Sequence, residues 1–377
     1  MREEKNSQRK KIKIVYIMPT LDQGGAERAL VNLILNLDFN IYEPSLILFK
    51  RGGLWLNELK AANIPVQILN KKWKIDFKNF FELFNILKQT NPQIVHTQLG
   101  GDLYGRIAAR VLKIKIIVST EQNLNPDENI INNFLKRITS RFAKKIIAIS
   151  EAVKKDLIYR YKISENKISI IPNGIELNKY LEFSKNNKKE KTTKIILGTI
   201  GRLVPQKGHA ILIKALAKLK DIDFECQIAG RGRQEIKLNK QIEYLGLTNK
   251  IKLIGAINDV PNFLNSLDIF VFPSLWEGQG IVLLEAALMN LPIIASEVDG
   301  IKEILNNETA YLVKSGDVNS LSKKISWLIN NLGQETVTER SAKLKQEIIN
   351  KYSVSRMSQD YQKLYQELLN TYENITS

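Results

Sequence analysis

The segment from Pro273 to Ala287 carries the residue types that a site for a phosphorylated sugar needs. Glu277 stands in a turn with Gly278 and Gly280, and Glu285 follows on an apolar stretch typical of a helix. If the residues between the two carboxylates are mostly helical, the helical rise separates them by about 12 Å, the scale of a nucleotide sugar. Carboxylates accept hydrogen bonds from sugar and ribose hydroxyls, and N–H groups at a helix start bind phosphate. A structural charge pair at a helix start is the alternative.

Two glycine turns at predicted strand ends could admit a phosphate group. The turn after strand 195–200 carries Gly201, Arg202 and Lys207, and a glycine pair at 24–25 follows the first predicted strand. Glycine lets backbone N–H groups approach an oxyanion closely, and long cationic side chains bind phosphate oxygens. A tight turn with two solvated charges is the alternative interpretation.

The elements that must position these residues alternate along the chain. Short apolar runs rich in Ile, Val and Leu alternate with longer amphipathic stretches, a pattern that predicts βαβ units and parallel sheets buried on both faces. The strand candidates are 12–18, 45–49, 94–97, 116–119, 146–149 and 168–171, followed by 195–200, 224–228, 251–254, 269–272, 293–296 and 311–313. The sequence therefore predicts two Rossmann-like doubly wound domains facing across a cleft, with ligands at the carboxyl ends of the strands.

A polar stretch rich in Lys and Asn separates the two series of strands. It lies at 185–194 and has no apolar periodicity, so we expect a linker there. The first domain then spans 1–184 and the second 195–352, and we expect 353–377 to form a terminal helix that packs back on the first domain.

The charge balance indicates an anionic partner. The chain of 377 residues holds 56 Lys and Arg against 39 Asp and Glu, a formal net charge of +17. Residues 1–188 carry 32 basic and 18 acidic residues, while residues 189–377 carry 24 and 21. Nucleic acid and the anionic face of a membrane both fit this asymmetry.

Cysteine and histidine usage disfavours a metal or disulfide framework. Cys226 has no partner for an internal disulfide, which indicates a reducing compartment, hence the cytoplasm. Only His96 and His209 could join it in a zinc site. No apolar run approaches the roughly 20 residues of a membrane-spanning helix, and the run at 12–18 contains Lys13, so we interpret it as a strand rather than a signal peptide.

Taken in order, these motifs resemble the retaining GT-B glycosyltransferases of family four, also called group 1, which include bacterial enzymes of cell-surface polysaccharide biosynthesis. The resemblance covers most of the chain. Its motifs are Gly24-Gly25-Ala26-Glu27-Arg28, Val95-His96-Thr97, Ser150-Glu151, Pro172-Asn173-Gly174-Ile175, Gly201-Arg202 with Lys207-Gly208, Gly230-Arg231-Gly232, the Glu277 and Glu285 pair, and Pro292–Ser296 with Gly300, Ile301 and Glu303.

The resemblance implies roles for individual residues. Arg202 and Lys207 would neutralise the donor diphosphate, Glu277 would hold the donor sugar, and Glu285 would hold the ribose; the first three are the candidate catalytic residues. The full candidate donor site is Gly24, Gly25, Gly201, Arg202, Lys207, Glu277, Gly278, Gln279, Gly280, Ile281, Val282 and Glu285. The resemblance also implies that no metal and no cofactor is needed. Negative charge on the leaving group must be stabilised by a metal or by fixed cations and N–H dipoles, and this chain offers the latter.

Three glutamines depart from the family pattern. Gln98 and Gln122 stand where relatives commonly have histidine, and Gln279 stands where an aromatic residue is frequent. An amide still binds hydroxyls but does not move a proton as an imidazole does, so the donor sugar and the level of activity stay open. The candidate acceptor-side residues are Glu27, His96, Gln122 and Asn123, with a structural role as the alternative for His96.

Basic residues stand beside aromatic ones in the first domain. The segment 71–84 mixes Lys71, Lys72, Lys74 and Lys78 with five aromatic residues, and a second basic cluster lies at 136–145. This combination suits an anionic bilayer surface. A helix with a buried aromatic face and solvated lysines is the alternative.

These observations predict a cytoplasmic transferase bound peripherally to the inner face of the cell membrane. Its donor is a nucleotide sugar, most simply a UDP-sugar, and its acceptor a lipid-linked or surface glycan. A sugar-nucleotide epimerase or phosphorylase of the same fold is one alternative, and a basic nucleic-acid-binding protein is another. No nucleic-acid recognition module is evident, so we expect no nucleic-acid partner. The donor sugar, acceptor, linkage and oligomeric state stay open.

Overall fold

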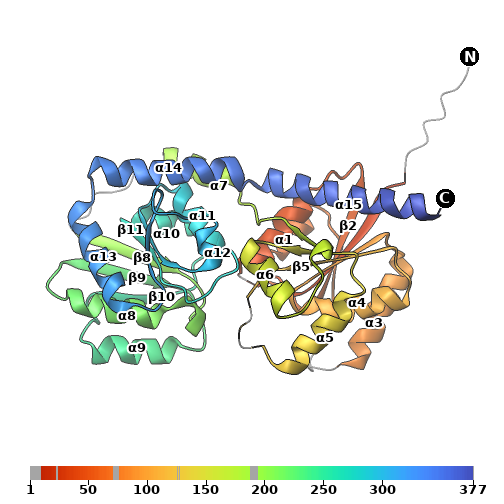
Figure 1. The fold of residues 1–377 in the computed structure, drawn as a ribbon, viewed down its shortest axis with the longest axis horizontal. Helices are drawn as coiled ribbons and strands as arrows, with labels where there is room; N and C mark the ends of the chain where they lie inside the picture. The colour runs from red at the N-terminus through yellow and green to blue at the C-terminus, as the bar shows by residue number, and fades with distance from the viewer. Residues whose placement is uncertain are drawn as a thin grey trace, which may run out of the picture. The chain divides into compact units, whose positions relative to one another are not determined.

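The computed structural model describes residues 10–22, 24–70, 76–124, 126, 128–186 and 194–376. Its contacts divide the chain into two compact units. The first runs up to Ile149 and adds Val153–Pro172 and Ser355–Ser377, and the second holds Ser150–Ala152 and Asn173–Val354. Each unit is an α/β domain built on one parallel sheet (Figure 1).

The first sheet has seven strands in the order β3-β2-β1-β4-β5-β6-β7. They are β1 (Ile12–Thr20), β2 (Tyr42–Arg51), β3 (Val66–Ile68), β4 (Ile94–Gln98), β5 (Ile116–Glu121), β6 (Lys145–Ala148) and β7 (Ile168–Ile170). All the neighbouring pairs are parallel, and β1 pairs with both β2 and β4. The strand order therefore reverses between β1 and β4, the place where doubly wound folds bind ligands.

Helices cover both faces of the first sheet. They are α1 (Gly25–Leu35), α2 (Leu56–Ala61), α3 (Phe77–Thr90), α4 (Asp102–Val111), α5 (Ile130–Ser140), α6 (Glu151–Tyr159) and α15 (Val354–Thr376). One core joins leucines and alanines of α3, α4 and α6 to β-branched residues of the strands. The polar residues of β4 show the alternation of a strand: Thr97 bonds to Asp102 of α4, while His96 bonds to Tyr365 of α15. Thus α4 and α15 lie on opposite faces.

The second sheet has six parallel strands in the order β10-β9-β8-β11-β12-β13. They are β8 (Ile195–Ile200), β9 (Phe224–Ala229), β10 (Ile251–Gly255), β11 (Ile269–Phe272), β12 (Ile293–Glu297) and β13 (Tyr311–Lys314). Its order reverses between β8 and β11, which pair directly through Leu197 with Ile269 and Gly198 with Phe270. The carboxyl ends of these two strands are the expected ligand position in this domain.

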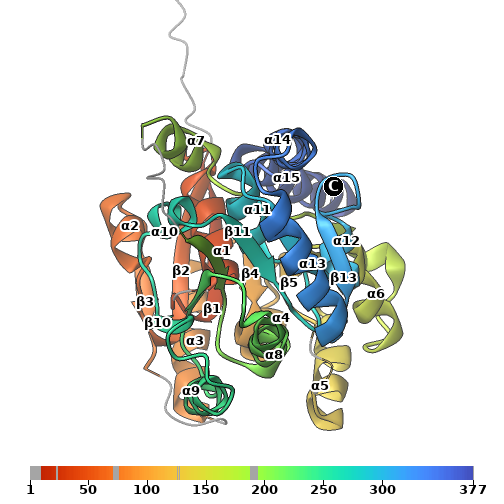
Figure 2. The same ribbon diagram turned by 90° about the vertical axis from the view of Figure 1, so that its left-hand side faces the viewer.

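Two apolar cores enclose the second sheet. The helices are α7 (Leu177–Asn186), α8 (His209–Leu216), α9 (Glu235–Tyr244), α10 (Val260–Ser266), α11 (Ile281–Leu288), α12 (Asp299–Lys302), α13 (Val318–Asn331) and α14 (Glu335–Lys351). Side chains of α8, α9 and α13 form one core, and those of α7, α10, α11 and α14 form the other. Helices α8 and α13 pack side by side (Figure 2). Helices therefore cover both faces of the sheet, and its central strand β11 is fully buried, whereas the edge strand β10 is partly exposed.

The predicted fold class of two Rossmann-like parallel-sheet domains is confirmed. Every predicted strand is present with small differences at its ends, and the structure adds the short edge strand β3, whose three residues are too few for a periodic signal. Residues 173–184, expected in the first domain, cluster with the second unit together with residues 185–186 of the expected linker, because α7 packs against α10 and α11. Most of the expected linker, 187–193, lies outside the described residues. Helix α15 from Ser355 onward clusters with the first unit.

In the described part of the chain, no helix is long and apolar enough to cross a membrane.

Candidate active site

The candidate site of the second domain is built by the loops that follow β8 and β11. These adjacent strands end at Ile200 and Phe272, so the turn 201–208 and the turn 273–280 start at the same sheet edge. The backbone N–H of Leu275 donates to Gln206 O at 2.7 Å, and the Gln206 side chain donates to Trp276 O at 3.0 Å. The two loops are thus hydrogen-bonded into one wall at the point where the strand order reverses.

An ion pair between Lys207 and Glu277 lies at the centre of this wall. Lys207 Nζ is 2.5 Å from Glu277 Oε1, and the side chains are only 15% and 7% exposed. The lysine ammonium also lies 5.1 Å from the centre of the Phe272 ring, and its aliphatic stem passes over Gly201. Burial of both partners strengthens their attraction and restricts the two side chains to one arrangement. The two residues that the sequence assigned to diphosphate and sugar are therefore brought together.

Glycines allow the loops to approach each other. Gly208 has a φ of +65°, and a Cβ there would overlap the carbonyl oxygen of Pro273. Gly300, at the start of α12, faces the carbonyl oxygens of Glu277 and Gly278 so closely that any side chain would displace them. Only glycine combines a left-handed backbone with this contact at 208. The ion pair is thus held by a wall that tolerates no side chain at these positions.

Arg202 lies at the same edge but in a different environment. It follows β8 directly and its side chain is exposed. Among the described residues it forms no ion pair. An exposed guanidinium and a largely buried ammonium at one sheet edge suit an anion larger than a single phosphate, because they offer cations at two depths.

The helix after the second loop begins later than the sequence estimate assumed. Helix α11 starts at Ile281, after Gly280 in the left-handed conformation, so residues 277–280 are a loop. The estimate of about 12 Å between Glu277 and Glu285 therefore does not apply, because only the last four steps are helical. Ile281 and Val282 form the first turn of α11, where backbone N–H groups lack partners within the helix.

Glu285 is positioned by a residue that the sequence did not single out. Tyr180 of α7 is buried and donates its hydroxyl to Glu285 Oε1 at 2.6 Å. Because α7 lies 105 positions earlier in the chain, no local pattern in the sequence indicates this contact. The hydrogen bond orients the carboxylate that is the candidate ribose ligand.

Gln279 is turned toward the protein. Its side-chain carbonyl accepts from Asn173 N at 2.9 Å, and its amide donates to Asn173 O at 3.1 Å. The side chain is 3% exposed. This residue therefore ties the loop 277–280 to Asn173, and the departure from the family pattern at 279 is a structural feature of the loop.

The candidate residues of the first domain lie at the start of α1, in the loop after β5 and, for His96, in the interior of the domain. Gly24 is the N-cap of α1, and the Glu27 carboxylate folds back beside it, so a side chain at 24 would overlap this carboxylate. Gln122 is buried and Asn123 is half-buried after the end of β5. Gly25 is the first residue of α1.

His96 lies inside the first domain, under α15. Its Nδ1 is 2.6 Å from the Tyr365 hydroxyl, and its Nε2 is 2.8 Å from Thr120 Oγ1. Tyr365 further contacts Tyr16, and Thr120 contacts Tyr361. With both ring nitrogens bonded and 1% of the residue exposed, the geometry gives His96 a structural role. Burial lowers the pKa of His96 to about 3.

This pKa makes the stability of the fold depend on pH. The folded pKa lies below the ordinary value of 6.5, so between these values the unfolded chain binds more protons and the free energy of unfolding falls as the pH falls. Glutamine does not titrate, so in the His96→Gln variant we expect the slope of the unfolding free energy against pH to be smaller by up to about 1.4 kcal/mol per pH unit. Urea unfolding between pH 7 and pH 5 measures it, and equal slopes for the variant and the parent protein would contradict the assignment.

Among the described residues, no group of three or more His, Cys, Asp or Glu side chains is arranged to hold a metal ion. His209 is buried at the start of α8, where burial and the nearby Lys207 lower its pKa to about 4. Burial likewise raises the pKa of Cys226 to about 12. At neutral pH, His209 is therefore an uncharged imidazole and Cys226 a protonated thiol.

Comparison with known proteins identifies the family. The model described as Glycosyltransferase Family 4 matches residues 23–179, and the model described as Glycosyl transferases group 1 matches residues 181–349. The two matches together span both domains. The chain belongs to this family of glycosyltransferases and has its GT-B fold.

Individual relatives cover nearly the whole chain. The UDP-Gal:alpha-D-GlcNAc-diphosphoundecaprenol alpha-1,3-galactosyltransferase of Escherichia coli is 27% identical, over 95% of this chain and 98% of the relative. The GalNAc-alpha-(1->4)-GalNAc-alpha-(1->3)-diNAcBac-PP-undecaprenol alpha-1,4-N-acetyl-D-galactosaminyltransferase of Campylobacter jejuni is 27% identical, over 95% and 99%. The structure of Anabaena HepE with UDP and glucose superimposes with a TM-score of 0.82 at 22% identity, over 94% of this chain and all of HepE, and thus shares the fold.

Proposed function

We propose that this glycosyltransferase moves a sugar from a UDP-sugar to a lipid-linked glycan, in the biosynthesis of a surface polysaccharide at the cytoplasmic face of the membrane. The first domain receives the acceptor and the second binds the donor. The activities of the two bacterial relatives, which act on undecaprenol-linked acceptors, support the substrate classes. The observation that carries the proposal is the buried Lys207 and Glu277 pair in a glycine-walled loop at the strand-order reversal.

The proposed roles follow from the donor and acceptor capacity of each group. The Lys207 ammonium has three N–H donors and gives one to Glu277, so others can reach the donor phosphate. Arg202 reaches the same diphosphate from the exposed side, and the N–H groups at the start of α11 add positive potential. Glu277 accepts from hydroxyls of the donor sugar, and Glu285, oriented by Tyr180, accepts from those of the ribose.

We propose that the reaction retains the anomeric configuration and needs no divalent metal. Charge that develops on the leaving diphosphate is stabilised by Lys207, Arg202 and the helix start. The acceptor hydroxyl attacks from the face that the diphosphate leaves, the bond between the anomeric carbon and the phosphate oxygen breaks, and this oxygen takes the acceptor proton. No nucleophilic side chain of the protein takes part.

A direct assay tests the proposal. Purified protein in EDTA is incubated with a panel of UDP-sugars, with and without a short-chain polyprenyl-diphosphate glycan, and released UDP is measured. We expect UDP release only with the acceptor present, and a product whose new linkage has the donor's anomeric configuration by NMR. Donor turnover without an acceptor would instead indicate an epimerase or hydrolase, and strict dependence on Mg²⁺ or an inverted linkage would contradict the mechanism.

A further inference from the structure

Helix α5 of the first domain has its apolar side outward. Ile130, Ile131 and Phe134 are 85%, 70% and 60% exposed, and Leu135 follows at 37%. These residues recur at helical spacing, so they form one face over the first turns of the helix. Large apolar side chains gathered on one exposed face indicate an interaction surface rather than scattered surface residues.

The inward side of α5 is polar. Lys136 points inward, where its ammonium pairs with the buried Glu121 and lies 4.2 Å from the centre of the Tyr161 ring. Thr139 and Ser140 complete the buried side of the helix. A helix folding in water normally buries its apolar face and exposes its lysines. Glu121 compensates the charge of the inward Lys136, and the arrangement leaves the apolar face of α5 exposed.

Neighbouring helices extend this face. Helix α4 packs against both α3 and α5, so the three helices are adjacent (Figure 1). Phe77 and Phe81 of α3 are 72% and 63% exposed, and Val111 at the end of α4 is exposed as well. Exposed apolar side chains are therefore present on all three adjacent helices and not on α5 alone.

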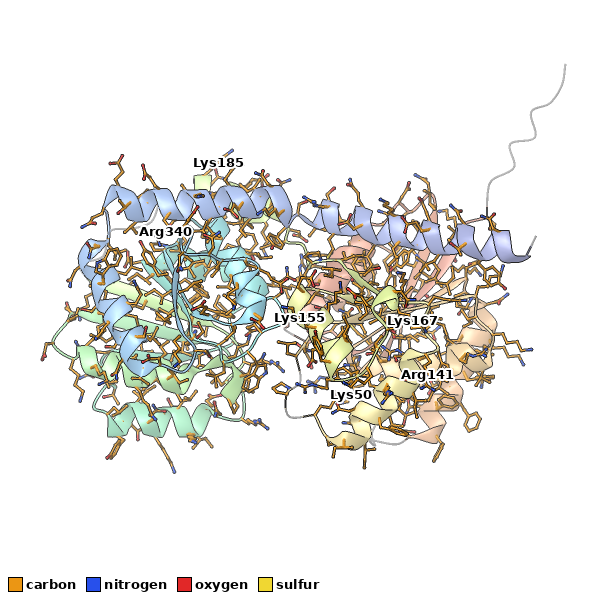
Figure 3. The ribbon with its side chains drawn as sticks, viewed as in Figure 1. Lys50, Arg141, Lys155, Lys167, Lys185 and Arg340 are labelled. Carbon is orange, nitrogen blue, oxygen red and sulfur yellow. The ribbon has the colours of Figure 1, made fainter. Side chains whose placement is uncertain are left out.

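Cations border the apolar residues. Arg137 and Arg141 continue the exposed side of α5, Lys144 follows, and Lys78 lies between the two exposed phenylalanines of α3. Lys167 joins them by donating to Arg141 O at 3.0 Å, and Figure 3 shows both of these cationic side chains on the first domain. Apolar side chains beside exposed cations complement the acyl and headgroup layers of an anionic bilayer. Like charges on this surface also oppose pairing with a second copy of the chain.

We propose that α5 docks the protein on anionic lipid, inserting Ile130, Ile131 and Phe134 into the acyl boundary while Arg137 and Arg141 contact headgroup phosphates. Residues 71–75 of the lysine-rich segment predicted for docking, 71–84, lie outside the described residues, and the rest of that segment belongs mostly to α3. Helix α5 carries part of the second predicted basic cluster, 136–145, and adds the exposed apolar residues that the sequence analysis did not single out. The inference deepens the proposed function and rests on it for one point only, that the acceptor is held in a membrane. Docking by α5 would place the acceptor-binding domain against the lipid in which the acceptor resides.

Sedimentation with vesicles tests the docking surface. Vesicles of phosphatidylcholine with one-third phosphatidylglycerol are mixed with the full chain and with the triple variant Ile130→Ser, Ile131→Ser, Phe134→Ser. We expect the variant to bind at least tenfold more weakly, with an unchanged melting temperature because all three side chains are exposed. The matched control is Ile236→Ser with Tyr244→Ser on α9 of the second domain, where both residues are at least as exposed as Phe134. Its binding should equal that of the parent protein.

The outcomes separate docking from catalysis. Equal vesicle binding by the triple variant, or an equal loss in the α9 control, would overturn the docking proposal. A loss of dimer in light scattering without a loss of vesicle binding would assign the surface to a second copy instead. Transfer to a water-soluble short-chain acceptor should be unchanged in the triple variant. If the parent protein shows no such transfer while docking depends on α5, the proposed function fails and the docking surface stands.

Discussion

Replacing Glu277 with glutamine is expected to lower kcat/KM for sugar transfer by at least about 100-fold, or about 2.7 kcal/mol of transition-state stabilisation. The amide keeps the shape of the side chain but removes the charge that holds Lys207 Nζ at 2.5 Å. The variant would then lose both the sugar contact and the fixed direction of the ammonium toward the diphosphate. Initial rates at varied UDP-sugar and fixed acceptor give the value.

A second glutamate provides the control. Glu308 also pairs with a lysine, Lys343, but its side chain is 74% exposed. Glu308→Gln makes the same chemical change at a solvated pair, where such pairs contribute little, so we expect parental kinetics. Undiminished activity in a folded Glu277→Gln variant would refute the site.

Lys207→Met tests whether the pair acts as a unit. Each single variant should lose most of the activity, and the double variant should lose little more, because groups that act together are not additive. If the two residues acted independently, the free-energy losses of the two single variants would add up to the loss of the double variant. Additive losses would leave both residues in the site but contradict the coupling that the buried ion pair implies.

Gly208→Ala is expected to destabilise the second domain by about 3 kcal/mol or more and to abolish donor binding. The left-handed backbone at φ +65° is strained for alanine, and the new Cβ would overlap Pro273 O. Relieving the overlap moves the loop that carries Lys207, and small displacements of positioning groups cost large factors in rate. Urea unfolding and the thermal shift on adding UDP measure the two effects.

Gly246→Ala is the matched control for this substitution. Gly246 has nearly the same φ, +66°, but the nearest atom to a new Cβ is the end of the flexible Lys220 side chain, at 3.8 Å. The Gly246→Ala substitution should lower the free energy of unfolding by the conformational strain alone, about 1–2 kcal/mol. Donor binding should stay intact. Equal costs at the two positions would show that the contact with Pro273 does not constrain the loop.

The local patterns of the sequence were sufficient to predict the two sheets and the loops that carry the site. Apolar runs, amphipathic stretches and glycine turns are short-range features, and each follows from the conformational preferences of neighbouring residues. The sequence also indicates that Lys207 and Glu277 follow separate strands. What it leaves undetermined is that these strands are neighbours in the sheet, since strand order depends on which helices cross which face.

The contacts that define the site join residues far apart in the chain. Lys207 and Glu277 are 70 positions apart, Tyr180 and Glu285 are 105 apart, and Gln279 is 106 from Asn173. In the sequence, Gln279 departs from the family pattern, and this departure leaves the identity of the donor sugar open. In the structure, the side-chain amide of Gln279 is hydrogen-bonded to the backbone N–H and C=O of Asn173. Side-chain direction at such positions is set by packing, which no local pattern encodes.

The sequence by itself determined the fold class, the resemblance to a glycosyltransferase family and the loops at the carboxyl ends of β8 and β11. The tertiary structure alone decided that His96 is enclosed by α15, 269 positions away, and that α5 faces its lysine inward and its isoleucines outward. The physical reason is the same in both cases. A residue's chemistry depends on its burial and partners, and these are fixed by segments that meet only after the chain has folded.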